Sequence, residues 1–249
     1  MDFPNVLNSQ RQPSSVRKIK TGIHGLDELI GGGFPAGRTY LVCGEAGAGK
    51  TTFALQFIRH GALSGEPGVY LTIDEKPEHV IDDAASLGWD FEKLIEENLV
   101  IIAELTHHFT GGGIPADKII EEINAIRSQV NAVRLAIDPI APLVLEAEGG
   151  GDMVRMQTLV RGYIRKLVHS LDEMGVTTVA TSEIPTGTNQ LSRYGIEEFV
   201  ASGVIVLNFR REGMGFKREI YVRKLRGVNH SMNVYNYVIQ KELGIVISI

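Results

Sequence analysis

The chain has 249 residues, of which 43% are hydrophobic and 22% charged, enough for one large α/β domain or two small ones. Its net charge of −5 gives no overall attraction for nucleic acid, although it leaves room for a local basic patch. A lone cysteine, Cys43, an N-terminus without a signal-peptide pattern and the absence of a long apolar run together predict a cytoplasmic protein without a membrane span.

The first residues differ from the rest of the chain. Residues 1–14 are polar, contain Pro4 and Pro13 and show no periodicity, so we interpret them as a mobile tail. Residues 15–249 contain no stretch that reads as a linker, and we expect them to form one domain. Within it, apolar residues at 26–30 have the spacing of a short helix that ends at a run of glycines.

The next stretch, Gly44 to Thr52, reads GEAGAGKTT and fits the phosphate-loop motif G-x-x-x-x-G-K-[ST]. A predicted strand at 38–43 precedes it and a predicted helix at 53–61 follows, which is the context that the motif requires. Glycines let backbone N–H groups surround an anion, and the positive end of the helix faces the same place. The residues expected to hold the nucleotide are Gly44, Ala46, Gly47, Ala48, Gly49, Lys50, Thr51 and Thr52, with Lys50 on the phosphates and Thr51 on Mg²⁺.

Strands and helices alternate after this loop. We expect strands at 69–73, 99–103, 133–137 and 176–181, helices at 77–87, 117–130 and 152–174, and loops at 105–116 and 146–151. Such alternation indicates a parallel sheet flanked by helices. Beyond residue 203 the pattern changes to short strands at 203–209, 217–225, 233–240 and 243–248, which read as antiparallel hairpins at one edge of the sheet. The predicted fold class is therefore α/β, mainly parallel, with C-terminal antiparallel strands.

Asp138 ends one of the predicted strands. A carboxylate at this position can hold a water on Mg²⁺, whereas the simpler alternative is that it caps a turn. The phosphate loop upstream favours the metal-side role.

Asp74 and Glu75 end the strand that follows the loop helix. Ligands of open parallel sheets bind at the carboxyl ends of strands, so a carboxylate there could orient and deprotonate an attacking water. Adjacent strand residues point in opposite directions, and we expect only one of the pair to face the γ-phosphate. The alternative is that the pair forms the acidic start of a helix at Pro77.

Several further stretches carry a family resemblance. They are TGIHGLD at 21–27, GGGFPAG at 31–37, the phosphate loop, DEKP at 74–77, Asp138, YGIEEF at 194–199 and KLRGVNH at 224–230. With them the chain resembles the single-domain KaiC-like ATPases of the RecA superfamily over nearly its whole length past residue 15. The stretch 224–230 is the specific one, since many folds share the phosphate loop.

The resemblance implies a RecA-like P-loop NTPase core whose subunits form a hexameric ring, with ATP and Mg²⁺ at the subunit interfaces. It also implies that Lys224, Leu225, Arg226 and His230 reach the phosphates of a neighbour. We expect Lys224 and Arg226 to share one face of a late strand, far from the phosphate loop of their own subunit. The alternative is a pair of solvated charges that protect a sheet edge.

The chain departs from the family pattern at three places. Asp74 stands where the family has Glu, so hydrolysis is expected to be slow or to depend on Glu75. Pro139 stands where the family has Ser. Glu198 and Phe199 stand where the second domain of the clock proteins carries its phosphorylated Ser-Thr pair, so no autokinase activity is expected.

Three functions are compatible with these features. The first is an ATP-hydrolysing ring that acts as a switch on an unknown protein partner. The second is a RecA-type accessory protein that binds single-stranded DNA through the loop 185–194 and the C-terminal basic residues Arg210, Arg211, Lys217, Arg218, Arg223, Lys224 and Arg226, although this loop has little charge. The third is a nucleotide-binding regulator without turnover. The pair His107-His108 lacks metal-ligand spacing and is assigned to a loop surface.

Overall fold

The structure, a computed structural model, describes residues 16–105, 115–145, 153–185, 187–188 and 190–249. The predicted tail at 1–14, the loop at 146–151 and His107-His108 lie outside these ranges. Among the described residues, no helix is both long and apolar enough to cross a membrane.

A nine-stranded sheet in the order β11-β10-β9-β8-β3-β7-β6-β4-β5 forms the centre of the molecule. Its strands are β3 (Thr39–Gly44), β4 (Gly68–Thr72), β5 (Val100–Glu104), β6 (Arg134–Asp138), β7 (Thr177–Glu183), β8 (Gly203–Glu212), β9 (Gly215–Leu225), β10 (Tyr235–Gln240) and β11 (Gly244–Ile247). The six strands from β8 to β5 pair in parallel, and β9, β10 and β11 pair antiparallel. The predicted α/β fold class is confirmed.

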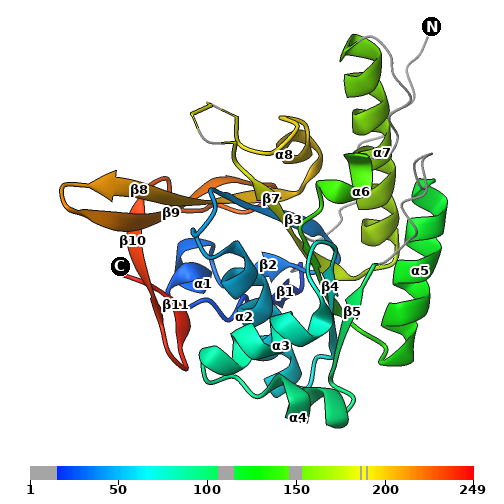
Figure 1. Cartoon of the computed structure of the whole chain (residues 1–249), viewed down its shortest axis with the longest axis horizontal. Coiled ribbons are helices and arrows are strands. Elements are labelled where there is room, and N and C mark those ends of the chain that lie inside the picture. Colours follow the sequence, from blue (N-terminus) through cyan, green and yellow to red (C-terminus); the bar gives the residue numbers. More distant parts are fainter. Residues whose placement is uncertain (1–15, 106–114, 146–152, 186, 189) are drawn as a thin grey trace, which may run out of the picture.

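Helices cover both faces of this sheet (Figure 1). The helices are α1 (Leu26–Leu29), α2 (Lys50–Leu63), α3 (Pro77–Ser86), α4 (Phe91–Glu96), α5 (Ala116–Gln129), α6 (Pro142–Leu145), α7 (Met153–Glu173) and α8 (Glu197–Val200). α2, α3 and α4 share one hydrophobic core, and α5 and α7 share the other. Along β3 the side chains alternate between them, with Tyr40 and Val42 in the first core and Leu41 and Cys43 in the second.

Apart from α1, which the sequence predicted, the short elements were not anticipated. A two-stranded sheet joins β1 (Lys18–Ile19) to β2 (Phe34–Pro35), and α4, α6 and α8 have at most six residues. Gly33 makes the small sheet possible, because its φ is 131° and a Cβ there would lie 2.4 Å from the carbonyl oxygen of Ile19. Elements of this length usually show too few residues for a periodic pattern to be recognised, and α1 was found through the run of glycines that ends it.

The C-terminal strands differ in one respect from the prediction. They form antiparallel hairpins as expected, but β8 also pairs in parallel with β3, so it belongs to the parallel core as well. The far ends of β8 and β9 continue beyond the sheet as a two-stranded ribbon (Figure 1). Pairing with β3 places the C-terminal third of the chain directly beside the strand that leads into the phosphate loop.

Candidate functional site

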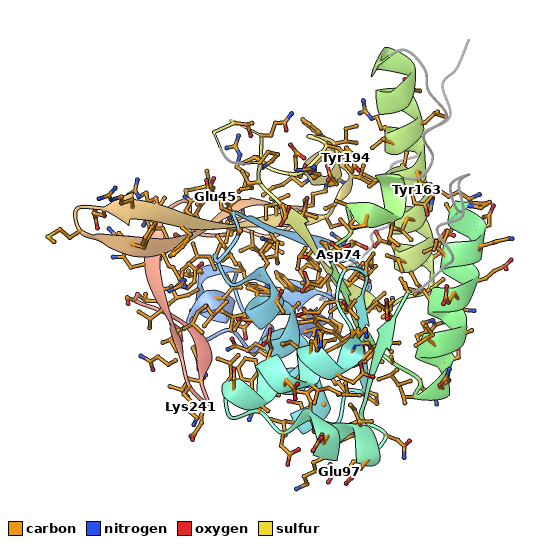
Figure 2. All side chains as sticks on the ribbon, viewed as in Figure 1. Glu45, Asp74, Glu97, Tyr163, Tyr194 and Lys241 are labelled. Carbon is orange, nitrogen blue, oxygen red and sulfur yellow. The ribbon has the colours of Figure 1, made fainter. Side chains whose placement is uncertain are left out.

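The parallel strands end at one edge of the sheet, where the predicted site residues gather. Gly44 at the end of β3 is level with Glu183 at the end of β7, and Thr72 of β4 is level with Asp138 of β6. The phosphate loop follows β3 directly, and Asp74 follows β4; Figure 2 labels Glu45 of this loop and Asp74. This edge is where ligands of open α/β sheets bind.

The phosphate loop has the backbone shape of an anion cradle. Gly47 and Gly49 have φ values of 79° and 91°, which residues with a side chain rarely adopt. Helix α2 begins at Lys50, three residues earlier than predicted, so its N-terminus faces the loop. A bound triphosphate fits this arrangement, because the glycine-rich backbone of the loop and a helix N-terminus face the same space.

Lys50 folds over the loop. Its Nζ donates hydrogen bonds to the carbonyl oxygens of Gly44 at 3.0 Å and Glu45 at 3.1 Å. Burial lowers the pKa of Lys50, while the carboxylates of Glu183 and Asp138 raise it. The ammonium is thus held at the centre of the loop by weak acceptors that a phosphate could replace.

Asp138 is fixed by hydroxyl groups from neighbouring elements. Thr51 Oγ1 donates to Asp138 Oδ2 at 2.7 Å, Tyr70 Oη donates to the same oxygen at 2.5 Å, and Thr181 Oγ1 donates to Oδ1. Burial and the nearby Asp138 raise the pKa of Tyr70 far above its usual value, so Tyr70 stays a donor. The expected Thr51 and Asp138 pair is therefore in contact, which is the donor set that suits Mg²⁺ bound partly through water.

Tyr70 and Thr181 were missed in the sequence. Both lie inside strands that read only as apolar or β-branched segments. The parallel register of β4, β6 and β7, which brings them to Asp138, is a tertiary feature.

Both carboxylates of the acidic pair act electrostatically on the site: Asp74 is coupled to Glu183 and Asp138, and the charge of Glu75 helps to raise the pKa of Tyr70. Partial burial raises the pKa of Asp74, and the carboxylates of Glu183 and Asp138 raise it further. Glu75 is half-buried, and its backbone is held by the Thr72 hydroxyl, which donates to Glu75 O at 2.8 Å and accepts from Glu75 N at 3.2 Å. A raised pKa makes Asp74 a stronger base once it is ionised.

Glu183 was also missed, because the predicted strand stopped at Thr181. β7 continues to Glu183, and the exposed Glu183 carboxylate influences the pKa of both Lys50 and Asp74. It therefore belongs to the candidate site.

The C-terminal strands form a wall beside the phosphate loop. Tyr237 Oη donates to the carbonyl oxygen of Ala48, and Arg218 Nη2 donates to that of Gly47 at 3.3 Å. The Arg218 guanidinium also lies 4.7 Å from the centre of the Phe209 ring. These three side chains come from β8, β9 and β10, and sequence patterns did not place them here.

Lys224 and Arg226 lie at the other end of the sheet. Leu225 is level with Gly203, which is level with Tyr40, so the end of β9 is about 13 Å along the strands from Gly44. The predicted remoteness from the phosphate loop of the same chain is thus seen. The distance arises because β9, two strands from β3, runs in the opposite direction and therefore ends at the opposite edge of the sheet.

Both basic side chains bind the backbone of α8. Lys224 Nζ donates to Glu198 O at 2.6 Å, and Arg226 Nη2 donates to Phe199 O at 2.8 Å. Burial and the nearby Arg226 lower the pKa of Lys224 to about 8, although Glu198 opposes the shift. His230 is half-buried, with Nδ1 3.0 Å from Ser231 O.

The other C-terminal basic residues separate into different groups. Arg210 pairs with Glu219 at 2.7 Å, and Lys217 lies 3.4 Å from Glu219 and 3.8 Å from Glu212. Acidic side chains thus lie among the basic residues of the β8–β9 hairpin. Within the described ranges, no three His, Cys, Asp or Glu residues cluster as a metal site.

Comparisons with known proteins agree with this geometry. A family profile described as "ATPase: KaiC" matches residues 19–249. The circadian clock oscillator protein KaiC of Synechococcus elongatus is 35% identical over 244 residues, which cover 96% of this chain and 45% of that protein. KaiC of Prochlorococcus marinus subsp. pastoris is 36% identical over 237 residues, which cover 93% of this chain and 45% of that protein.

A solved structure shows the same fold. The crystal structure of a KaiC-like protein from the archaeon Pyrococcus horikoshii OT3 matches with a TM-score of 0.81 and 42% identity, covering 94% of this chain and 100% of that one. The chain spans less than half the length of the clock proteins but the full length of the archaeal one.

Proposed function

This chain belongs to the KaiC family of ATPases, and on this basis we propose that it binds ATP with Mg²⁺ and hydrolyses ATP slowly. We further propose that copies assemble into a ring, hexameric as the family resemblance implies, with ATP at each interface. The nucleotide state of the ring would then act as a switch on a protein partner.

One observation carries the proposal: the phosphate loop, the Thr51–Asp138 contact and Asp74 meet at a single edge of the sheet. Lys50 and the loop N–H groups would bind the phosphates, and Thr51 and Asp138 would hold Mg²⁺ directly and through water. Bound Mg²⁺ would supply positive charge that offsets the negative charge developing on the phosphates.

Asp74 is the proposed general base. In this role it accepts a proton from a water directed at the γ-phosphate, and its raised pKa favours that transfer. Its side chain is one methylene shorter than the Glu of the family pattern, and the longer distance that results is the proposed cause of slow turnover. Glu75 is the alternative base.

Arg226 would complete the site of a neighbour. Its side chain contacts α8 at the edge opposite its own phosphate loop, so it is poorly placed to serve the nucleotide of the same chain. In a head-to-tail ring, Arg226 and Lys224 would approach the phosphates held by the adjacent copy, as an arginine finger does.

The nucleotide-site assignment is tested by Lys50→Ala. Removing the ammonium leaves a polyanion without its central counter-charge, so we expect ATP affinity to fall about 10- to 100-fold. Titration calorimetry of the purified chain with ATP and Mg²⁺ measures this directly. Lys93→Ala on α4 is the control, because Lys93 is exposed and makes only a 3.9 Å contact with Glu97. Normal ATP affinity in a folded Lys50→Ala protein would disprove the assignment.

A further inference from the structure

Helices α7 and α8 pack against each other away from α2 (Figure 1). A small hollow is lined by side chains of these two helices and by Arg226. Its volume is about 260 Å³, and it is lined by Arg161 and Arg165 of α7, Phe199 and Val200 of α8, and Arg226. Three of these five residues carry a guanidinium and none carries a carboxylate. We call this hollow the arginine pocket.

The charges of the arginine pocket are not neutralised within the described part of the chain. Some arginines of the described chain have acidic partners, as Arg134 does with Glu66 at 2.6 Å and Arg210 with Glu219 at 2.7 Å. Neither Arg161 nor Arg165 has an ion-pair partner among the described residues, and both are exposed. Guanidinium groups that share one hollow repel one another, and an anion between them would remove that repulsion.

Arg226 is joined to the pocket by one hydrogen bond from its guanidinium. Its bond to the Phe199 carbonyl oxygen is 2.8 Å long and uses one of the five N–H donors of the guanidinium. The remaining donors, with those of Arg161 and Arg165, suit the planar, multi-oxygen geometry of phosphate.

A second copy of the chain offers the complementary surface. The carboxyl edge of the sheet carries the acidic side chains of Glu45, Asp74, Glu75 and Glu183 and is the proposed place of the triphosphate. The arginine pocket lies on another face, so the two surfaces can meet only between copies arranged head to tail. Phe199 is 63% exposed at the pocket, and a docked copy would cover it.

We propose that Arg161 and Arg165, together with Arg226, receive the terminal phosphates of the nucleotide bound to a second copy. The ligand is thus a nucleoside triphosphate presented by a neighbour, and the two α7 arginines are binding residues of a composite site. This inference rests on the proposed function, since it requires a nucleotide in the phosphate loop.

The test uses the double variant Arg161→Gln/Arg165→Gln of the full chain. Its control is Lys166→Gln, which removes a charge from the same helix, but from a side chain that pairs with Asp117 of α5 at 2.6 Å. Sedimentation velocity with a slowly hydrolysed ATP analogue and Mg²⁺ reports assembly, and calorimetry at a concentration below assembly reports nucleotide affinity.

We expect the double variant to bind nucleotide like the parent but to need about tenfold more protein for half-assembly, which corresponds to roughly 1.4 kcal/mol. The control should assemble like the parent. Assembly of the double variant at the parental concentration would overturn the pocket proposal and leave the nucleotide site intact. A parent that binds no nucleotide would overturn the proposed function itself, and a parent that binds nucleotide without assembling would overturn only the composite site.

Inorganic tripolyphosphate distinguishes two possible ligands of the arginine pocket, a free phosphate anion and the phosphates of a nucleotide bound to a second copy. The Lys50→Ala chain has a weakened phosphate loop but a complete arginine pocket. Tripolyphosphate should not bind it measurably, because the second copy is needed to present the anion. If tripolyphosphate does bind the Lys50→Ala chain, and this binding disappears when Arg161 and Arg165 are also replaced, the arginine pocket binds free anions. That result would overturn the proposal that a second copy occupies the pocket. Arg165→Lys keeps the positive charge at this position. If assembly is weakened by the loss of charge and not by a disturbed α7, Arg165→Lys in place of Arg165→Gln should restore part of it.

Discussion

Single residues of the site differ in how firmly the fold holds them. Asp138 receives hydrogen bonds from Thr51, Tyr70 and Thr181 and is therefore locked in one orientation. Asp74 is exposed, and its pKa is raised by partial burial and by neighbouring carboxylates. The first arrangement suits a fixed metal ligand, and the second suits a group that must exchange a proton during each cycle.

The acidic pair gives a prediction at this scale. Asp74→Asn combined with Glu75→Gln should leave ATP affinity nearly unchanged, since neither carboxylate is needed to hold phosphate. Turnover should fall about 100-fold or more, because a general base contributes at least that much. Phosphate release and calorimetry on the same preparations measure the two quantities.

The single variants identify the base. We expect Asp74→Asn to account for most of the loss, because Asp74 is coupled to Asp138 and Glu183. If Glu75, with its longer side chain, accepts the proton instead, Glu75→Gln would account for most of the loss of turnover. Parental turnover in the double variant would show that the pair is only a helix start.

At the scale of elements, α8 depends on one buried carboxylate. Glu197 is 1% exposed and accepts hydrogen bonds from Ser192 Oγ at 2.7 Å, Ser182 Oγ at 3.3 Å, and the backbone N–H groups of Ile196 at 3.1 Å and Tyr194 at 3.3 Å. This network joins the loop before α8 to the end of β7. It also fixes the helix whose carbonyl oxygens hold Lys224 and Arg226.

Glu197→Gln therefore should destabilise the protein. The amide NH₂ would face N–H and O–H donors, so at least one buried group would lose its acceptor, at a cost of about 1–3 kcal/mol. Urea denaturation measures the free energy of unfolding. Glu173→Gln on α7 is the control, since that side chain is 70% exposed and its replacement should change stability by less than about 0.5 kcal/mol. Equal stability of the two variants would contradict the importance of the network.

At the scale of the whole molecule, the phosphate loop and Arg226 lie at opposite edges of one sheet. On the proposed function, a chain with this layout would have an incomplete site alone, and a ring of identical copies would complete every site by the same contact. The sheet is thus the element that sets the spacing between the two halves of each proposed composite site.

Mixing variants tests this layout. Lys50→Ala has an intact Arg226 but a weakened loop, and Arg226→Ala has an intact loop but no finger, so each alone should have little ATPase activity. In rings that form at random from equal amounts, about a quarter of the interfaces would join an intact loop to an intact Arg226. We therefore expect about a quarter of the parental activity per site.

The control for this experiment shows that the two variants enter the same ring. The two variants carry different fluorescent labels, and energy transfer between the labels must be seen before activities are compared. If mixed rings form and activity stays at the level of the separate variants, Arg226 does not act on a neighbour.

Much of this protein could be predicted from local sequence. The phosphate loop is recognisable because an anion cradle needs glycines, a lysine and a hydroxyl at fixed spacing within one short segment. The parallel strands are recognisable because helices cover both faces of the sheet, so that each strand is a nearly continuous apolar segment. Asp74 and Asp138 stand out for a similar reason, since each is a carboxylate at the end of such a segment.

Tertiary structure alone decided the rest, because the deciding distances join residues far apart in the chain. Tyr70 and Thr181 meet Asp138 only through the order and register of β4, β6 and β7. Arg218 reaches Gly47 because β8 pairs with β3 and brings β9 with it. The arginine pocket likewise combines α7, α8 and the end of β9, and no sequence period links them, since strand order and direction are set by packing of the whole sheet.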